Sequence, residues 1–184
     1  IPPEYADCID RIVLVKKTRV VSAITGFTRM DAYDPKEHTK VSSLSKSKSR
    51  WLPALENRGE GIFFSFNNRA LNEWKKCNDV KERFDRIMTV QKKIKTDPED
   101  YKHDPKYVFL HTFSHTIMKS LAELAGYSTA SFTERIYCGD GMAGIFIYTS
   151  SSSSDGSLGG LVDIGRQGDE SRIGDVLASA VLES

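Results

Sequence analysis

The sequence predicts an α+β fold, an irregular mixed sheet packed by amphipathic helices, and two observations support this prediction. Val- and Ile-rich runs typical of strands occur together with helical patterns, without the regular strand–helix–strand rhythm of a parallel sheet. The composition, 39% hydrophobic and 28% charged over 184 residues, is that of an ordinary globular domain. Residues 1–184 are therefore expected to form one domain or most of one. Because the chain opens without Met and closes on an amphipathic run, we expect a fragment of a larger protein.

The first half of the chain is expected to contain strands and then helices. Residues 11–30 are rich in Val and Ile, which predicts one long strand, two short strands, or a helix running into a strand. The polar residues 31–50 predict an exposed loop, and "GEGIFFSF" (59–66) predicts a compact strand after a glycine turn. Helical composition follows over 68–95, with Asp79 as the N-cap of its second part. The core-facing stripe of that part is expected to be Val80, Phe84, Ile87, Val90 (or Gln91) and Ile94.

The second half is expected to begin with a polar connector, residues 96–105, and a long helix. The helix is predicted from about Pro105 to Ala125, with Gly126 as its C-cap. Its apolar stripe comprises Leu110, Phe113, Ile117, Leu121 and Leu124. The segment "FTERIYC", a strand over 142–150 and a last helix from about Gly168 are expected to follow.

Two histidines on the long helix form a candidate metal-ligand pair. His111 and His115 are four residues apart and share one helix face, as two ligands do in zinc peptidases. Those enzymes need Glu directly after the first His, where this chain has Thr112. A third ligand could come from His38, His103, Cys138 or a carboxylate, none of them at a characteristic spacing. The favoured interpretation is that the pair fixes the helix or contacts a partner, with metal binding as the lesser alternative.

No catalytic constellation is recognisable, so a non-enzymatic chain without a cofactor is expected. The Ser/Gly run at 150–162 matches neither GxGxxG nor GxxxxGK[ST], although its N–H groups could contact an anion or a nucleic-acid backbone. There is no GxSxG motif for a serine hydrolase. Three scattered cysteines argue against a disulfide framework and are typical of a reducing cytoplasm.

The charge distribution favours a nucleic-acid partner. Residues 1–110 carry 22 Lys and Arg against 16 Asp and Glu, whereas residues 111–184 carry 4 against 9. Residues 39–50 contain four Lys and Arg residues and no acid. A basic tract of this kind can neutralise phosphates, although solvated loops have the same composition. No apolar run approaches the roughly 20 residues of a membrane span. The candidate DNA-contacting residues are Lys40, Lys46, Lys48 and Arg50, together with Arg29 and Arg58.

Three segments in this order, "ITGFTRM", "WLPALENRGEGIFFSF" and "LHTFSHTIMKSLAELAGYSTASFTERIYCGDGMAGIFIYTSSSSSDGSLGGLV", resemble the C-terminal region of the DrmB family. DrmB proteins are the helicase-associated subunits of the bacterial DISARM anti-phage system. The same region is similar to the zinc-binding domain of MrfA-type DNA-repair helicases. The residues of this chain that match the family motif are His111, His115, Arg135, Gly159 and Gly160.

The resemblance implies a non-catalytic module that works beside a helicase motor on DNA. The expected DNA partner includes duplex with a single-stranded overhang, and the expected location is the cytoplasm. In the family, four cysteines after the "LGGLV" segment bind a structural zinc, and this chain contains none of them. Either the fragment ends before these cysteines or this member lacks them, so a structural zinc is expected only in the full-length parent. Two alternatives are a scaffold that docks the motor without touching DNA, and a metal-dependent or serine hydrolase.

Overall fold

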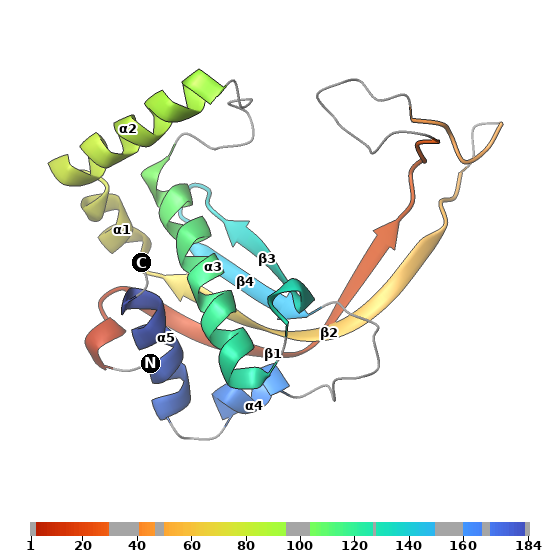
Figure 1. Ribbon diagram of the computed structural model, residues 1–184. Coiled ribbons are helices and arrows are strands. Elements are labelled where there is room, and N and C mark those ends of the chain that lie inside the picture. Colours follow the sequence, from red (N-terminus) through yellow and green to blue (C-terminus); the bar gives the residue numbers. More distant parts are fainter. Residues whose placement is uncertain are drawn as a thin grey trace.

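The computed structural model describes residues 3–29, 41–46, 50–94, 104–126, 128–149, 160–166 and 170–182. It confirms the α+β class: a four-stranded sheet of order β1-β2-β4-β3 packs against helices (Figure 1). The described strand pairs are all antiparallel, so the expected mixed sheet is corrected. A helical crossover does bring β3 into the same direction as β2, but the hairpin partner β4 lies between them.

The two longest strands of the sheet, β1 and β2, pair with each other. β1 (Ile9–Ala23) is the single long strand among the predicted alternatives, and it pairs with β2 (Ala54–Phe66) over almost its whole length. The expected glycine turn before residue 59 is wrong, because β2 begins at Ala54 and Gly59 lies within it. A Cβ atom on Gly59 would overlap the carbonyl oxygen of Thr149. Gly59 therefore marks the close approach of β4 rather than a turn.

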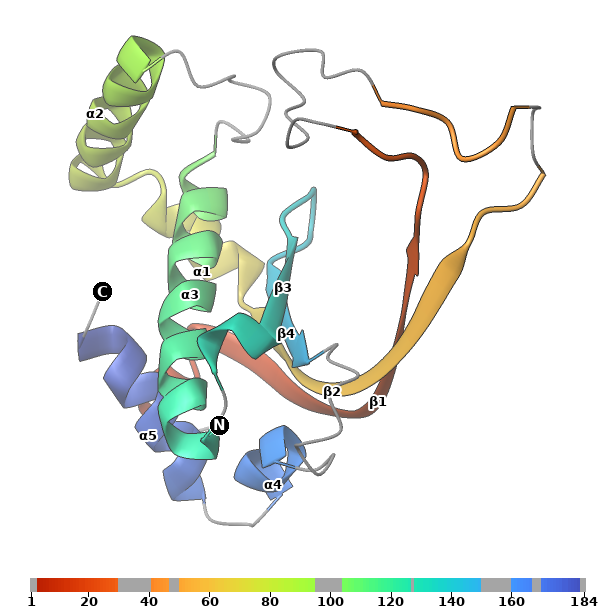
Figure 2. The same cartoon turned by 45° about the vertical axis from the view of Figure 1, so that its right-hand side comes forward.

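The outer parts of β1 and β2 extend beyond the rest of the sheet. β4 (Gly144–Thr149) pairs with β2 only from Gly61 to Ser65, and β3 (Phe132–Tyr137) pairs with β4. The remaining two-stranded ribbon curves away from the helices (Figures 1 and 2). We call residues 16–29, 41–46 and 50–59 the β-arm. Of the expected loop 31–50, residues 41–46 and 50 are described, and all except Ser42 are exposed.

Helices α1 (Asn68–Trp74) and α2 (Asn78–Ile94) follow β2, as predicted. The expectation that Asp79 is the N-cap of α2 is wrong, because α2 begins at Asn78 and Asp79 lies within its first turn. The expected core stripe is only half-buried at Val80, Phe84 and Ile87, and Val90 is exposed. The physical reason is position, since α2 lies at the periphery and does not cover the sheet (Figure 1). The side chains of Gln91 and Ile94, and most of the expected connector 96–105, lie outside the described residues.

The long helix α3 (Pro105–Ala125) matches its prediction at both ends. Asp104 is the N-cap, whose carboxylate accepts the Lys106 N–H at 2.9 Å, and Gly126 caps the C-terminus with φ 70°. The predicted stripe is buried from Leu110 to Leu121, whereas Leu124 is wrong because it is 41% exposed beyond the edge of the packed surface.

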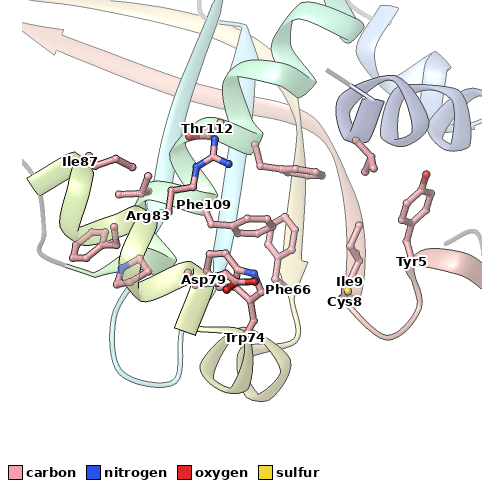
Figure 3. A pocket seen from close by; sticks show the side chains of 16 residues that line it. Tyr5, Cys8, Ile9, Phe66, Trp74, Asp79, Arg83, Ile87, Phe109 and Thr112 are labelled. Carbon is pink, nitrogen blue, oxygen red and sulfur yellow. The ribbon is translucent and has the colours of Figure 1, made fainter. Parts of the chain in front are cut away.

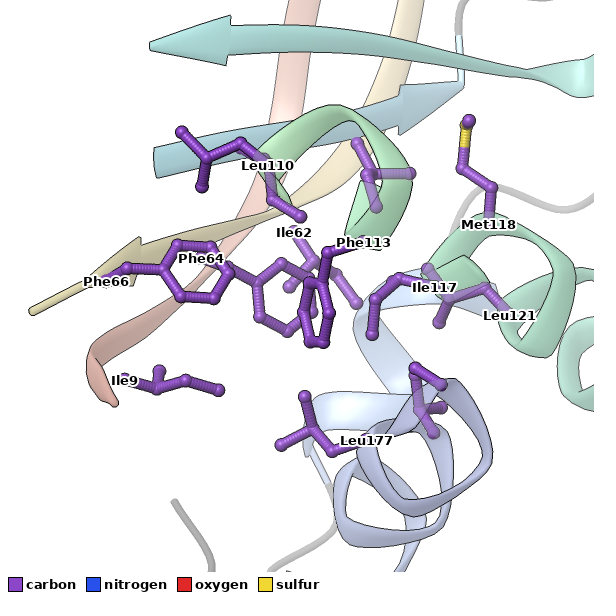
Figure 4. Packing of buried hydrophobic residues seen from close by; sticks show 14 of the residues in the cluster. Ile9, Ile62, Phe64, Phe66, Leu110, Phe113, Ile117, Met118, Leu121 and Leu177 are labelled. Carbon is purple, nitrogen blue, oxygen red and sulfur yellow. The ribbon is translucent and has the colours of Figure 1, made fainter. Parts of the chain in front are cut away.

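One core joins α3 to the sheet and to the C-terminal helix (Figure 4). α3 packs on β3, β4 and α5 (Glu170–Leu182). Phe64 of β2, Phe113 of α3 and Leu177 of α5 lie together in this core. A short helix that the sequence did not indicate, α4 (Gly160–Arg166), packs on β2. The remaining elements within the described residues are two 3₁₀ turns, η1 (Pro3–Tyr5) and η3 (Thr129–Ser131).

Candidate functional site

The β-arm is the most basic part of the described chain. It carries seven Lys and Arg residues and one acid, Glu56. Glu56 is shared by two cations, with carboxylate oxygens 3.7 Å from an Arg19 nitrogen and 3.5 Å from Arg58 Nε. Because these side chains are exposed, the pairs leave the charge of the arm largely uncompensated. The seven basic residues are Lys16, Lys17, Arg19, Arg29, Lys46, Arg50 and Arg58.

The backbone of the arm spreads these charges over a narrow ribbon. The β1–β2 register is shifted between Val15 and Thr18, so Lys16 and Lys17 lie at a bulge, where side chains are re-aimed. Farther out, Arg19 lies directly opposite Arg58. A two-stranded β-ribbon has the width that the DNA major groove admits. The geometry therefore suits an elongated anionic partner.

Four of the six predicted DNA-contacting residues, Arg29, Lys46, Arg50 and Arg58, are exposed on the β-arm. Lys40 and Lys48 lie outside the described residues. Sequence reasoning missed Lys16, Lys17 and Arg19, because they are embedded in a Val-rich strand. Their signal was the interruption of that apolar run by "KKTR", which is typical of a strand with a solvent-facing side.

Apolar side chains accompany the charges on the arm. Trp51 is 73% exposed, and Val21, Ile24 and Phe27 are also exposed. An aromatic ring next to cations offers a surface on which nucleobases can stack. The same atoms could contact another protein, so the composition of the arm alone does not identify its partner.

The two predicted histidines meet a third candidate ligand, Glu134. The Nε2 atoms of His111 and His115 are 3.2 Å apart, and Glu134 Oε1 lies 3.2 Å from the first and 3.5 Å from the second. The side chains are 39%, 59% and 20% exposed, respectively. These three residues form the His–His–Glu cluster.

Two elements hold the cluster in place. The histidines are one turn apart on α3, and Glu134 lies on the edge strand β3. The buried Ser114 hydroxyl donates to Glu134 Oε2 and lies 2.8 Å from the His111 carbonyl oxygen. The Tyr107 ring lies nearly parallel to His111, with centroids 6.1 Å apart. The sequence signal for Glu134 was strand alternation, which places it on the same face as Phe132.

The remaining family-motif residues, Gly159, Gly160 and Arg135, do not belong to the His–His–Glu cluster. Gly160 begins α4, and Gly159 lies outside the described residues. The N–H groups of Leu161 and Val162 donate to the two Glu60 carboxylate oxygens at 2.8 and 3.4 Å. The N–H groups of the Ser/Gly run 150–162 were expected to contact an external anion. For Leu161 and Val162 this expectation is wrong, because their acceptor is the protein's own Glu60 carboxylate. Arg135 is exposed on β3, with its guanidinium 5.8 Å from the Tyr137 ring centroid.

An apolar groove of about 590 Å³ lies between α2, α3 and the start of β1 (Figure 3). Phe66, Phe109 and Ile87 line it, with Arg83 and Asp79 on its α2 side. The half-buried stripe of α2 therefore lines an open surface rather than a closed core.

Over most of its own length, the chain is similar to a known DISARM protein. No protein-family model matches it. None of the helices in the described part is both long and apolar enough to span a membrane. The chain is 37% identical over 172 residues to the DISARM protein DrmB of Bacillus paralicheniformis, a match that covers 90% of this chain and 31% of that protein. The chain thus spans about a third of its relative's length. The resemblance expected from the sequence is confirmed: the chain is similar to one region of DrmB, consistent with the C-terminal region.

Proposed function

We propose that this chain is a DNA-contacting, helicase-supporting module of a bacterial DISARM anti-phage defence complex. The observation that carries the proposal is the β-arm, a protruding ribbon with seven basic residues and one acid. The similarity of the chain to DISARM protein DrmB supports the defence role.

The physical basis of the contact is counterion release. Each Lys or Arg that neutralises a phosphate frees a condensed cation from DNA, which favours binding at low salt. Exposed Lys16 and Lys17 at the bulge and Arg50 near the tip would follow the phosphate backbone. Trp51, beside Arg50, would stack on a base where the duplex opens into a single strand. This arrangement favours a substrate with both duplex and single-stranded parts.

The module would act without catalysis of its own. The sequence lacks the GxxxxGK[ST] motif of P-loop nucleotide hydrolases, and a helicase motor would supply ATP hydrolysis as a partner or as another part of the parent protein. The cytoplasm, where phage DNA and this complex would meet, is the proposed location.

Fluorescence anisotropy with a labelled duplex bearing a single-stranded overhang, measured across a salt series, tests this proposal. The unmodified chain should bind saturably, with log affinity falling linearly against log salt. The arm variant Lys16→Ala/Lys17→Ala/Lys46→Ala/Arg50→Ala should lose up to about 3.6 from the steepness of that line, since each phosphate contact contributes about 0.9. Trp51→Ala should weaken binding to the overhang more than binding to blunt duplex.

A matched control separates specific contact from net charge. The variant Lys81→Ala/Arg86→Ala removes two exposed charges from α2, and it should be compared with Lys46→Ala/Arg50→Ala, which removes two from the arm. The arm pair should lower the slope by about 1.8, and the α2 pair should leave it nearly unchanged. Equal effects of the two pairs would contradict a contact at the arm.

The alternative is a protein scaffold that docks the motor without touching DNA, and the apolar groove beside α2 favours it. In that case the chain would bind the motor subunit yet give no anisotropy change with DNA at low salt. Arg83→Glu in the groove would then weaken the motor complex, while the four-residue arm variant would not.

A further inference from the structure

We infer that His111, His115 and Glu134 form a binding site for a divalent transition-metal ion of the zinc class, with one coordination position open to solvent. This site would be separate from the four-cysteine zinc that the family resemblance implies for the parent protein. It does not rest on DNA binding by the β-arm.

The first argument is the size of the triangle formed by the three ligand atoms. Its edges are 3.2 Å between the two Nε2 atoms, 3.2 Å from His111 Nε2 to Glu134 Oε1, and 3.5 Å from His115 Nε2 to Glu134 Oε1. Ligand atoms about 2.0–2.1 Å from a tetrahedral zinc ion lie about 3.3–3.4 Å from one another. One ion can therefore contact all three atoms with little movement of the side chains.

The second argument comes from counting protons. If both imidazoles carry a proton on Nε2, each can donate to Glu134 Oε1, but the two donors then face each other at 3.2 Å. If one Nε2 is unprotonated, it loses its bond to the carboxylate. Hydrogen bonds thus satisfy at most two edges of the triangle. A cation attracts the lone pairs of all three atoms at once.

The third argument is the support behind the ligands. The Ser114 hydroxyl donates to Glu134 Oε2, which orients the carboxylate so that Oε1 faces the histidines. Ser114 itself is fully buried, which fixes this partner in place. Hydrogen bonds of this kind to ligating side chains orient them and strengthen binding. The cluster therefore has both an inner set of ligands and a buried outer partner.

Exposure indicates what kind of metal site this is. Structural zinc sites close four protein ligands around the ion, whereas catalytic sites use three and keep the last position for water or substrate. Here the three ligands include two partly exposed histidines, with 39% and 59% of their side chains accessible. Two histidines and a glutamate are also a ligand set found in zinc hydrolases. The open position would hold a water molecule.

Zinc binding can be measured on the purified chain with Zn²⁺ alone, in competition with a chromophoric chelator. The Cys8→Ser/Cys77→Ser background removes the two exposed thiols, which could otherwise bind the probe. One equivalent of Zn²⁺ should bind in this background. Glu134→Gln, which keeps the shape of the side chain, and His115→Ala should each lower affinity at least about a hundredfold. Glu123→Gln, an exposed carboxylate on the same helix, should leave it unchanged.

Three further readouts do not depend on the variants being equally stable. Co²⁺ bound in place of Zn²⁺ should give the absorption of nitrogen and oxygen ligands without a thiolate charge-transfer band. In the unmodified chain, Zn²⁺ at about a hundred times its Kd should raise the Tm by about 5–10 °C. Long-range imidazole NMR spectra should show Nε2 coordination of both histidines.

The site is refuted if Zn²⁺ does not bind saturably, or if it binds equally well to the Glu134→Gln and His115→Ala chains. Coordination that the NMR spectra assign to other histidines, or a thiolate band with Co²⁺, would also overturn it. The four-residue arm variant should retain full Zn²⁺ affinity, so failure of this site and failure of the DNA contact are distinguishable.

Discussion

Glu60 offers a sharp test of how this fold is held together. Its side chain is 2% exposed, and its oxygens accept the N–H groups of Leu161 at 2.8 Å and Val162 at 3.4 Å. These two groups belong to the first turn of α4, which has no intrahelical acceptors for them. A residue of β2 therefore fixes the start of a helix 101 positions later in the chain.

The variant Glu60→Gln keeps the shape of the side chain and removes one acceptor. Its amide oxygen can still accept the Leu161 N–H, but its NH₂ group would face the Val162 N–H, donor against donor. A hydrogen bond to a charged acceptor contributes about 1.5–3 kcal/mol, and a buried unsatisfied donor costs about 1–3 kcal/mol. Relief of the desolvated carboxylate offsets part of this loss. We expect Glu60→Gln to lower the free energy of unfolding by about 2 kcal/mol.

Urea denaturation followed by circular dichroism measures this change, and a thermal scan should show a Tm lower by about 4–8 °C. The matched control is Glu56→Gln, the same substitution four residues earlier on the exposed part of β2, which should change stability by less than about 0.5 kcal/mol. If the two variants are equally stable, the carboxylate does not hold α4 to the sheet, and the reasoning is refuted.

Two other predictions concern stability, and both are measured by urea denaturation. Gly59→Ala should cost about 3 kcal/mol or more, because its Cβ would overlap the Thr149 carbonyl, whereas Gly126→Ala, strained in φ but with nothing within 4 Å, should cost about 1 kcal/mol. Comparable losses for the two glycines would contradict the close approach of β4 to β2. Leu110→Ala, fully buried under the sheet, should cost about 2–5 kcal/mol, and Leu124→Ala should cost less than about 0.5 kcal/mol. A costly Leu124→Ala would place that side chain in a contact with the core.

The elements that sequence reasoning predicted well are those whose signals are local. The limits of α3 follow from Pro105 at its start and Gly126 at its end, and its buried stripe follows from the helical period. The same period on α2 overstated burial, because a regular stripe does not reveal whether another element lies against it. The apolar stripe of α2 faces an open groove, which is also lined by Phe109.

The features that the sequence could not provide depend on distant pairings. Nothing local connects Glu134 with His115, 19 positions earlier, until β3 is placed beside α3. Likewise, the glycines around Glu60 are typical of a turn, and only the close approach of β4, with Thr149 at Gly59 and Ile147 at Gly61, explains why they lie within a strand. The basic tract was recognised from composition, but its continuation into Lys16 and Lys17 required the β1–β2 register.

The length of β1 has a consequence for solubility. β1 is an edge strand of 15 residues, about three times the usual strand length, and such an edge is a template on which a second chain can add a strand. Natural proteins block this kind of association with bulges and with lysines placed along the edge. The bulge at Lys16 and Lys17 supplies both devices at the middle of β1. We therefore expect the same two lysines that give the arm its charge to oppose edge-to-edge association between copies of this chain.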